Sequence, residues 1–182
     1  MRVVAGELRG RRIIGPARDD PIRPTADRVR EALFSILGDL HEARVLDLFC
    51  GTGALGIEAV SRGAASATLV DVRTGVADRN VAALGIEGQC TVVRSDALDF
   101  LRRAGERFDL VLCDPPYSHV DSFEAELDQL LPDRIATGGR VVIESHSDNP
   151  IRLSLGLDRE RRYGRTLICV YRGPGRDERT PA

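Results

Sequence analysis

The segment Asp-Pro-Pro-Tyr at positions 114–117 holds the residues that could do chemistry most directly. Proline has no amide hydrogen to donate, and it restricts the residue before it to extended conformations. Because Asp114 and Pro115 each precede a proline, we expect a stiff segment. It would direct the Asp114 carboxylate, the Pro115 carbonyl oxygen and the Tyr117 ring toward one space. This arrangement suits an exocyclic amine on a nucleobase, since two acceptors bind its hydrogens while the ring stacks on the extracted base.

A glycine-rich loop lies upstream of this segment. Gly51, Gly53 and Gly56 fit the pattern G-x-G-x-x-G after an apolar run. Glycines at these positions let the backbone turn tightly and approach a ligand, and the helix that follows offers free N–H groups to an anion. Asp71, which ends the next apolar run, is placed to bind a ribose diol. The pattern predicts a nucleoside-type cofactor and, by itself, leaves a nicotinamide or flavin dinucleotide open.

Two further acids bear on the choice of cofactor. Asp47, four residues before Gly51, would repel a pyrophosphate and suits a ligand with a cationic amine or sulfonium. S-adenosylmethionine has both cations and no pyrophosphate. Asp96 follows a later apolar run and can accept a hydrogen bond from an adenine amine. Each acid also has a structural alternative, since Asp47 could cap backbone in the loop and Asp96 could be a helix N-cap.

Apolar strands alternate with helical segments over most of the chain, which is typical of a parallel sheet covered on both faces. The predicted strands are Val45–Phe49, Ala67–Asp71, Cys90–Arg94, Leu110–Cys113 and Arg140–Glu144, followed by a closing hairpin over Arg159–Arg162 and Thr166–Tyr171. The predicted helices between them are Ala54–Arg62, Gly75–Leu84, Ala97–Ala104 and Ser122–Ile135. We therefore expect an α/β fold with a mostly parallel seven-stranded sheet and an antiparallel C-terminal strand. Such sheets bind ligands at the carboxyl ends of their strands.

The N-terminal part differs from this pattern. Residues 1–22 predict a small basic β-hairpin with strands Arg2–Ala5 and Arg11–Ile14. A helix follows from about Thr25, its expected N-cap, to Leu37. We expect the main domain to span 23–172 and the polar tail 173–182 to be disordered.

Composition and charge narrow the class of protein. The 182 residues are 42% hydrophobic and 30% charged, as in an ordinary soluble domain, and no run is long enough for a membrane span or a signal peptide. We expect a cytoplasmic protein without membrane contact, monomeric by default. The four cysteines lack metal-ligand spacing, so we expect buried thiols and no metal.

The arginines are concentrated at both ends of the chain. Residues 1–30 hold eight arginines against four acids and residues 159–182 seven against three, whereas the stretch 31–158 holds eleven against twenty-one. Basic ends around an acidic middle suggest polyanion contacts near the termini, and we expect Arg9, Arg11 and Arg12 to bind phosphate. The complete absence of lysine has an alternative explanation in high-GC codon usage.

Four motifs together resemble the RsmD family of small-subunit ribosomal RNA guanine-N2 methyltransferases. They are MRVVAGELRGRRI, RPTADRVREALFSIL, DLFCGTGALG and DPPY. The glycine and D-P-P-Y motifs are shared by many amino-methyltransferases, while the two N-terminal motifs are more specific. The resemblance covers the chain to about Tyr171. It implies a Rossmann-like fold and S-adenosylmethionine-dependent methylation of the N2 of one guanine in 16S rRNA, within an assembled or partly assembled 30S particle.

The resemblance also implies roles for individual residues. The cofactor would lie along Asp47, Phe49, Gly51 and Gly53, with Asp71 at the ribose and Asp96 with Ala97 at the adenine. Asp114, Pro115 and Tyr117 would hold the target amine and base. The remaining candidates, near the RNA or the cofactor carboxylate, are Arg23, Thr25 and Arg28.

Other functions remain open at this point. An adenine-N6 or cytosine-N4 methyltransferase of DNA shares D-P-P-Y, but it usually needs a separate recognition domain for which this length leaves no room. A glutamine-N5 protein methylase explains the basic N-terminus less well than an RNA enzyme does. A nicotinamide oxidoreductase fits the glycines and leaves Asp47 and D-P-P-Y unexplained, and a non-catalytic RNA-binding module explains only the arginines.

Overall fold

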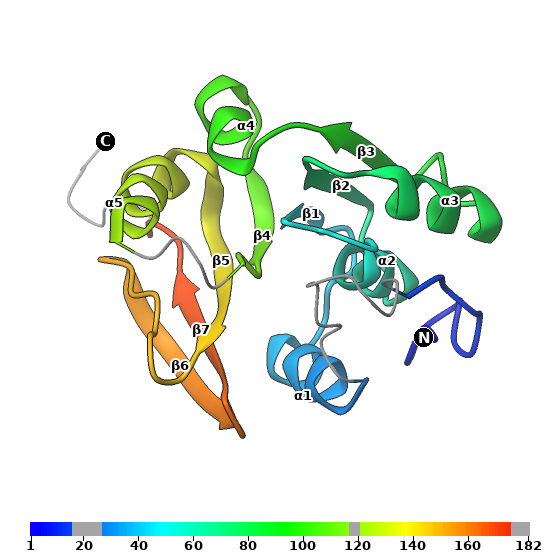
Figure 1. Ribbon diagram of the computed structural model, residues 1–182, viewed down its shortest axis with the longest axis horizontal. Helices are drawn as coiled ribbons and strands as arrows, with labels where there is room; N and C mark the ends of the chain where they lie inside the picture. Colours follow the sequence, from blue (N-terminus) through cyan, green and yellow to red (C-terminus); the bar gives the residue numbers. More distant parts are fainter. Residues whose placement is uncertain (16–26, 117–120, 176–182) are drawn as a thin grey trace, which may run out of the picture.

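The structure, a computed structural model, describes residues 1–15, 27–116 and 121–175 of the chain. They form a seven-stranded sheet in the order β3-β2-β1-β4-β5-β7-β6 (Figure 1). The strands are β1 (Arg44–Leu48), β2 (Ser66–Asp71), β3 (Cys90–Arg94), β4 (Phe108–Cys113), β5 (Ile135–His146), β6 (Gly156–Tyr163) and β7 (Thr166–Arg172). The pairs among β1 to β5 are parallel, and β7 is antiparallel to both β5 and β6. The predicted mostly parallel seven-stranded sheet is confirmed.

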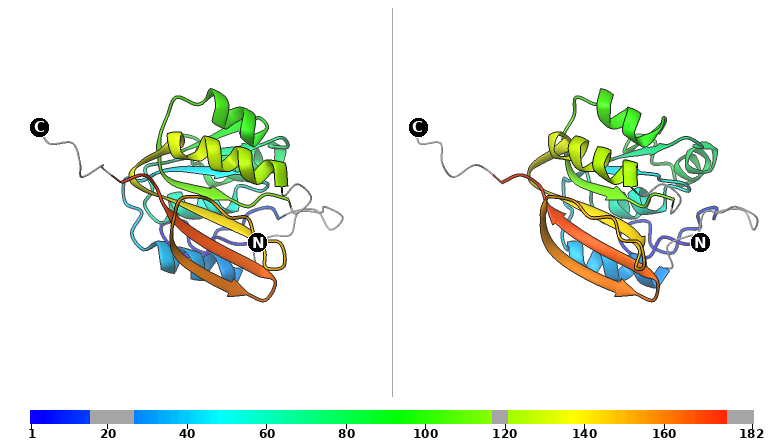
Figure 2. Two further views of the ribbon diagram at one scale, coloured as in Figure 1. Left: turned by 90° about the vertical axis from the view of Figure 1, so that its left-hand side faces the viewer. Right: turned by 60° about the vertical axis from the view of Figure 1, so that its left-hand side comes forward.

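Helices cover both faces of the sheet, as the two side views show (Figure 2). They are α1 (Asp27–Leu37), α2 (Ala54–Ser61), α3 (Gly75–Leu84), α4 (Ala97–Arg103), α5 (Asp121–Leu130) and the 3-10 helix η1 (Leu131–Arg134). One hydrophobic core joins α1, α2 and α3 to the sheet, and the other joins α4, α5 and η1 to the opposite face. Alternate residues of β1 show the division, since Val45 packs in the first core and Leu46 in the second. This two-sided burial explains why the central strands β1 and β4 are largely apolar rather than alternating.

The N-terminal segment, residues 1–15, turns back on itself as expected but forms only one isolated bridge, between Arg2 and Arg12. The two short strands predicted there are not formed. Many of the segment's backbone groups pair with helix side chains instead of with another strand. The buried Glu58 carboxylate of α2, for example, accepts from the backbone N–H of Val4 at 2.7 Å and of Ala5 at 2.9 Å. The segment is thus docked on α2 through its own backbone.

The start of β5 was also predicted wrongly. The helix expected to reach Ile135 ends at Leu130, and β5 begins at Ile135 rather than Arg140. The sequence Thr-Gly-Gly within this stretch is typical of a loop, but here it forms an irregular part of the strand. Gly138 has a φ of 76°, and a Cβ on Gly139 would lie 2.8 Å from a methyl carbon of Ile135. Glycine therefore lets the strand bend where a larger residue would clash.

Several other expectations can be compared with the structure. All four cysteines are free and buried. No helix in the described ranges is long and apolar enough to cross a bilayer. The predicted boundary between residues 22 and 23 and most of the 173–182 tail lie outside the described residues.

Candidate active site

The carboxyl ends of β1 and β4 bring the two sequence motifs together. The strands are neighbours, and Leu48 pairs with Cys113, so Phe49 and Asp114 leave adjacent strands at the same edge. We call this edge, where β1 to β5 end, the carboxyl edge of the sheet. Phe49 has a φ of 60°, which is uncommon for a residue with a side chain. Its ring meets that of Phe123 edge-on, with centroids 5.4 Å apart, so the turn after β1 is packed against the start of α5.

The glycine loop forms a tight passage from β1 to α2. Gly51 and Gly53 have φ values of 51° and 77°, a region that glycine enters without steric cost. Gly56 serves close packing, because a Cβ there would lie 2.1 Å from a methyl carbon of Leu69 and 3.2 Å from Asp47 Oδ2. The predicted tight turn is therefore observed at Gly51 and Gly53, whereas Gly56 is needed for close packing.

Asp47 is buried beneath this loop, with 2% of its surface exposed. Its Oδ2 atom accepts a hydrogen bond from the Gly56 N–H at 2.8 Å, which is the backbone cap considered as an alternative role. Within the described ranges, nothing donates a hydrogen bond to its Oδ1 atom. Burial raises the pKa of the carboxyl to about 7; the Gly56 N–H lowers it and the charge of Asp71 raises it further. A cationic group beside Oδ1 would stabilise the ionised form, so the site fits the amine or sulfonium of the expected cofactor.

Asp71 ends β2 and holds the same loop from its other side. One carboxylate oxygen accepts from the Gly51 N–H at 2.9 Å, and the other accepts from the Arg73 N–H at 2.9 Å. The acid is thus fixed at the carboxyl edge, next to the strand that carries Asp47. A carboxylate has more lone pairs than these two bonds use, so it can also accept from a ribose hydroxyl.

Asp96 and Ala97 lie where β3 passes into α4. Asp96 is the N-cap of α4, with its side chain accepting from the N–H groups of Leu98 at 2.9 Å and Asp99 at 3.2 Å. Ala97 is buried against the second core. The structural alternative for Asp96 is therefore observed, and a contact with adenine would have to be made in addition to the cap.

The D-P-P-Y segment is described only in part. Asp114 is half-buried, Pro115 is buried and Pro116 is exposed. Tyr117 lies outside the described residues, as do Arg23 and Thr25. The structure therefore places the acid and the first proline at the carboxyl edge and leaves the aromatic partner a prediction.

The other candidate arginines lie on the α1 and α3 side of the molecule. Arg28 is exposed in the first turn of α1. Arg9, Arg11 and Arg12 are exposed on the N-terminal segment, and Arg11 donates to the carbonyl oxygen of Ala83 at the end of α3. Figure 1 shows this segment beside α2, away from β6 and β7. These arginines are exposed along one side of the molecule, and the contact of Arg11 with Ala83 places it near the end of α3, toward the edge where the strands begin.

Sequence reasoning missed the polar residues that hold the N-terminal segment. Asn80 of α3, 1% exposed, exchanges two hydrogen bonds with the backbone of Ile14 and donates a third to the Thr52 carbonyl oxygen. Ser61 of α2 accepts from the Leu8 N–H and donates to the Ala5 carbonyl oxygen. Of these residues, only Glu58 could have been recognised from the sequence, because it is a lone acid within an otherwise apolar stretch of helix.

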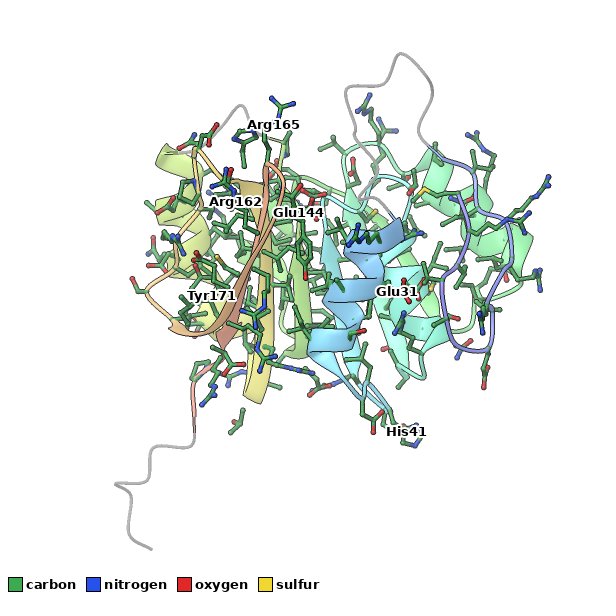
Figure 3. The ribbon with its side chains drawn as sticks, turned by 90° about the horizontal axis from the view of Figure 1, so that it is seen from below. Glu31, His41, Glu144, Arg162, Arg165 and Tyr171 are labelled. Atoms are coloured by element: carbon green, nitrogen blue, oxygen red, sulfur yellow. The ribbon has the colours of Figure 1, made fainter. Side chains whose placement is uncertain are left out.

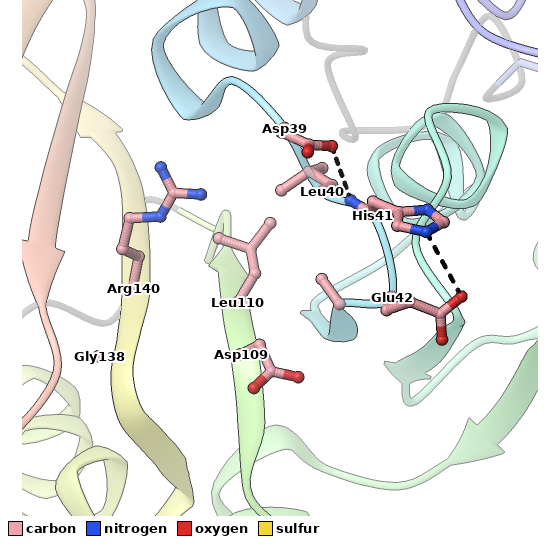
Figure 4. A pocket seen from close by; sticks show the side chains of 9 residues that line it. Asp39, Leu40, His41, Glu42, Asp109, Leu110, Gly138 and Arg140 are labelled. Atoms are coloured by element: carbon pink, nitrogen blue, oxygen red, sulfur yellow. Dashed lines mark hydrogen bonds and ion pairs between the residues drawn. The ribbon is translucent and has the colours of Figure 1, made fainter.

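A shallow pocket of about 340 Å³ lies at the opposite edge of the sheet, where the strands begin (Figure 4). Its lining includes Asp39, His41, Asp109 and Arg140, and none of the predicted site residues. It is therefore separate from the glycine loop. The described residues contain no group of three or more histidines, cysteines or acids that could hold a metal ion.

The sheet order and the glycine loop between β1 and α2 define a class: Rossmann-like methyltransferases that use S-adenosylmethionine. An RNA methyltransferase from Salinibacter ruber, solved with S-adenosyl-L-homocysteine, matches with a TM-score of 0.65 over 87% of this chain and 97% of that chain. Its sequence identity is 18%, so this likeness concerns the fold alone.

The family follows from closer matches. The family model described as conserved hypothetical protein 95 matches residues 1–172, and the chain belongs to this family. Ribosomal RNA small subunit methyltransferase D of Escherichia coli K12 is 36% identical over 98% of this chain and 92% of its own length. The protein of that name from Haemophilus influenzae is 32% identical over 83% and 81%. A solved structure of the methyltransferase yhhF from E. coli has 35% sequence identity to this chain and a TM-score of 0.82. The match covers 96% of this chain and 98% of that chain.

Proposed function

We propose that this protein transfers a methyl group from S-adenosylmethionine to the exocyclic N2 of a specific guanine in 16S rRNA. One observation carries the proposal. The register that pairs Leu48 with Cys113 sets the cofactor loop after β1 beside Asp114 after β4. The names of the E. coli and H. influenzae relatives support ribosomal RNA of the small subunit as the substrate class.

The chain's own groups would hold the cofactor along the carboxyl edge. Asp47, through Oδ1, and the backbone of Phe49, Gly51 and Gly53 would line its methionine part. The remaining contacts would be Asp71 at the ribose, and Asp96 with Ala97 at the adenine. When bound, S-adenosylmethionine supplies a methyl group on a positively charged sulfur, which is a strong electrophile.

Asp114 and Pro115 would prepare the target nitrogen. The lone pair of an exocyclic amine is delocalised into the base, so the amine is a weak nucleophile. The Asp114 carboxylate and the Pro115 carbonyl oxygen would accept its two hydrogens and favour a tetrahedral nitrogen whose lone pair points at the methyl group. Tyr117 would stack on the extracted base. Catalysis then rests on positioning and electrostatics, and the amine proton becomes acidic as the new N–C bond forms.

The basic N-terminal segment would hold the RNA. Arg9, Arg11 and Arg12 are placed to bind phosphates, and Arg23, Thr25 and Arg28 would lie near the RNA or the cofactor carboxylate. Such contacts fix the position of the RNA without reading its sequence. The substrate would be an assembled or partly assembled 30S particle, bound in the cytoplasm by a monomer.

The organisation of the chain is part of the proposal. Residues 1–22 would form the RNA-binding extension, 23–172 the methyltransferase domain and 173–182 a disordered tail. The matched family region ends at residue 172, which supports the second boundary.

The experiment compares methylguanine in the rRNA of cells with and without this protein by mass mapping. We expect one N2-methylguanine of 16S rRNA to disappear and to return with the wild-type gene. With purified protein, Asp114→Ala should slow methyl transfer by at least ~10²-fold, as expected for the loss of one transition-state contact. Its affinity for S-adenosylmethionine should change little. An unchanged methylation map, or wild-type turnover in Asp114→Ala, would contradict the proposal.

A further inference from the structure

A second group of arginines lies on the strand at the far end of the sheet from β3. Strand β6 is the edge strand, and its residues are exposed from Gly156 to Arg162. Three arginines on β6 and one in the turn after it are exposed, and we call them the β6–β7 arginines: Arg159, Arg161, Arg162 and Arg165. Among the described residues, none of the four forms an ion pair.

The acids on the same strand are already neutralised. Asp158 pairs with Arg172 of β7, and Glu160 pairs with Arg152. The bond from Arg152 lowers the pKa of the Glu160 carboxyl, so this acid stays charged and bound to its partner. The charge of the β6–β7 arginines is therefore not cancelled locally, and it faces solvent.

The turn between β6 and β7 lies at the carboxyl edge. Thr166, the first residue of β7, pairs with His146, the last residue of β5, and the Ser147 N–H donates to the Arg165 carbonyl oxygen at 2.8 Å. In Figure 3 Arg165 lies at the top with Arg162 below it, at about the height of Glu144, and His41 marks the opposite edge at the bottom. The turn therefore faces the same side of the molecule as the segment after β4.

The two basic regions flank the active site. The N-terminal segment is docked on α2 and α3, whereas β6 and β7 lie beyond β4 and β5, on the other side of β1 (Figure 1). A polyanion whose target base enters between β1 and β4 would meet arginines in both directions. Guanidinium groups suit this role because they bind phosphate oxygens in bidentate fashion.

We infer that Arg162 and Arg165, at the β6–β7 turn, bind phosphates of the substrate RNA on the side of the active site opposite the N-terminal segment. This inference rests on the proposed function and extends it by a second contact region. The RNA would be held on both sides of the extracted nucleotide, which fixes the base over Asp114. Arg159 and Arg161 lie farther along β6 and would contribute less.

The charge of this strand has a competing explanation in protection of an open sheet edge. Exposed edge strands can pair with other chains, and charged side chains discourage this. For that role the position of the charge along the strand does not matter. Phosphate binding instead requires charge near the turn, so the two explanations differ in what Arg162 and Arg165 do.

The test measures binding to an unmodified 16S rRNA transcript and to 30S subunits from cells lacking this protein, across a series of salt concentrations. Arg162→Gln/Arg165→Gln removes two charges at the carboxyl edge. Arg107→Gln removes an exposed charge just before β4, at the opposite edge, as a control, and Arg162→Lys/Arg165→Lys retains the charge. We expect Arg162→Gln/Arg165→Gln to bind RNA about tenfold more weakly. The slope of the logarithm of the binding constant against the logarithm of the salt concentration should fall in magnitude by about two, one for each phosphate contact. The control and the lysine variant should keep the wild-type slope.

Each other outcome overturns the inference. A wild-type slope in the glutamine variant, with or without self-association, would assign the arginines to edge protection. If the glutamine variant bound 30S subunits more weakly but bound the transcript normally, Arg162 and Arg165 would contact a ribosomal protein of the particle rather than RNA. In both cases wild-type methylation of rRNA would leave the proposed function intact. If the wild-type protein neither bound nor methylated rRNA, the proposed function itself would fail.

Discussion

The side-chain amide of Asn80 donates to the carbonyl oxygen of Thr52 at 2.9 Å and so ties α3 to the glycine loop. The same side chain donates to the Ile14 carbonyl oxygen at 3.0 Å and accepts from the Ile14 N–H at 2.7 Å. One buried residue thus joins the segment proposed to bind RNA with the loop proposed to bind the cofactor. Its substitution should affect both.

Asn80→Ala should release the N-terminal segment from α3. The change leaves the Ile14 N–H and the Thr52 carbonyl oxygen without their partner, so we expect a loss of about 2–3 kcal/mol in the free energy of unfolding. Hydrogen exchange at the Ile14 amide should accelerate. Arg79→Ala, at an exposed position of the same helix, is the control. Equal protection of Ile14 in both variants would show that other contacts hold the segment.

Asp47→Asn should change how stability depends on pH. Burial raises the pKa of the Asp47 carboxyl from 3.8 to about 7, so the unfolded chain releases this proton at a lower pH than the folded chain does. The stability from Asp47 is therefore fully present below pH ~4 and is lost as the pH rises through ~7, a fall of about 4 kcal/mol. Denaturant unfolding at several pH values should show this fall in the wild type and not in the variant. A parallel fall in both would contradict the assignment.

Asp47 should also make cofactor binding depend on pH. Below pH ~7 the carboxyl must lose its proton before it can pair with a cation. We expect the affinity for S-adenosylmethionine to rise by up to about tenfold per pH unit and to level off near pH ~7. Calorimetry should show this rise in the wild type. Asp47→Asn with the same ligand, and wild type with adenosine, which lacks the cations, should show no rise. A rise that persists in the variant would exclude Asp47 as its source.

Gly56→Ala should disturb the passage from β1 to α2. A Cβ at Gly56 would lie 2.1 Å from Leu69 Cδ2, so we expect a cost of about 1–3 kcal/mol and weaker cofactor binding as the loop shifts. Gly75→Ala is the matched control, because no atom lies within 4 Å of a Cβ built there. Thermal unfolding and calorimetry of both variants would measure the difference. Equal melting temperatures would mean that Leu69 moves aside without cost.

Local patterns in the sequence were enough to predict the architecture of the sheet and the edge at which the two motifs meet. Runs such as Val45–Phe49 and Cys90–Arg94 predict buried strands, and acids after such runs fall at strand ends because the chain alternates regularly with helices. Predicting the start of β5 failed, because Gly138 and Gly139 are typical of a loop and only packing against β4 shows that a strand can bend there.

The anchoring of the N-terminal segment could not be predicted from the sequence. Asn80 and Ile14 are 66 residues apart, and Glu58 and Val4 are 54 apart, so no local period joins them. A buried amide or carboxylate is recognised only when its partners are known, because its residue type alone is more typical of the surface. Asp47 and Asp96 show the same limit, since the sequence left both a backbone cap and a ligand role open for each of them.

The four buried cysteines have a practical consequence for following the motions of this enzyme. Burial raises the pKa of all four thiols, to about 12 for Cys90, and two of them lie at the carboxyl edge, Cys50 in the glycine loop and Cys113 just before Asp114. Alkylating reagents attack the thiolate, so in the native state labelling must wait for a local opening. The rate at which Cys50 or Cys113 is labelled therefore reports how often the glycine loop or the end of β4 opens, without any engineered probe.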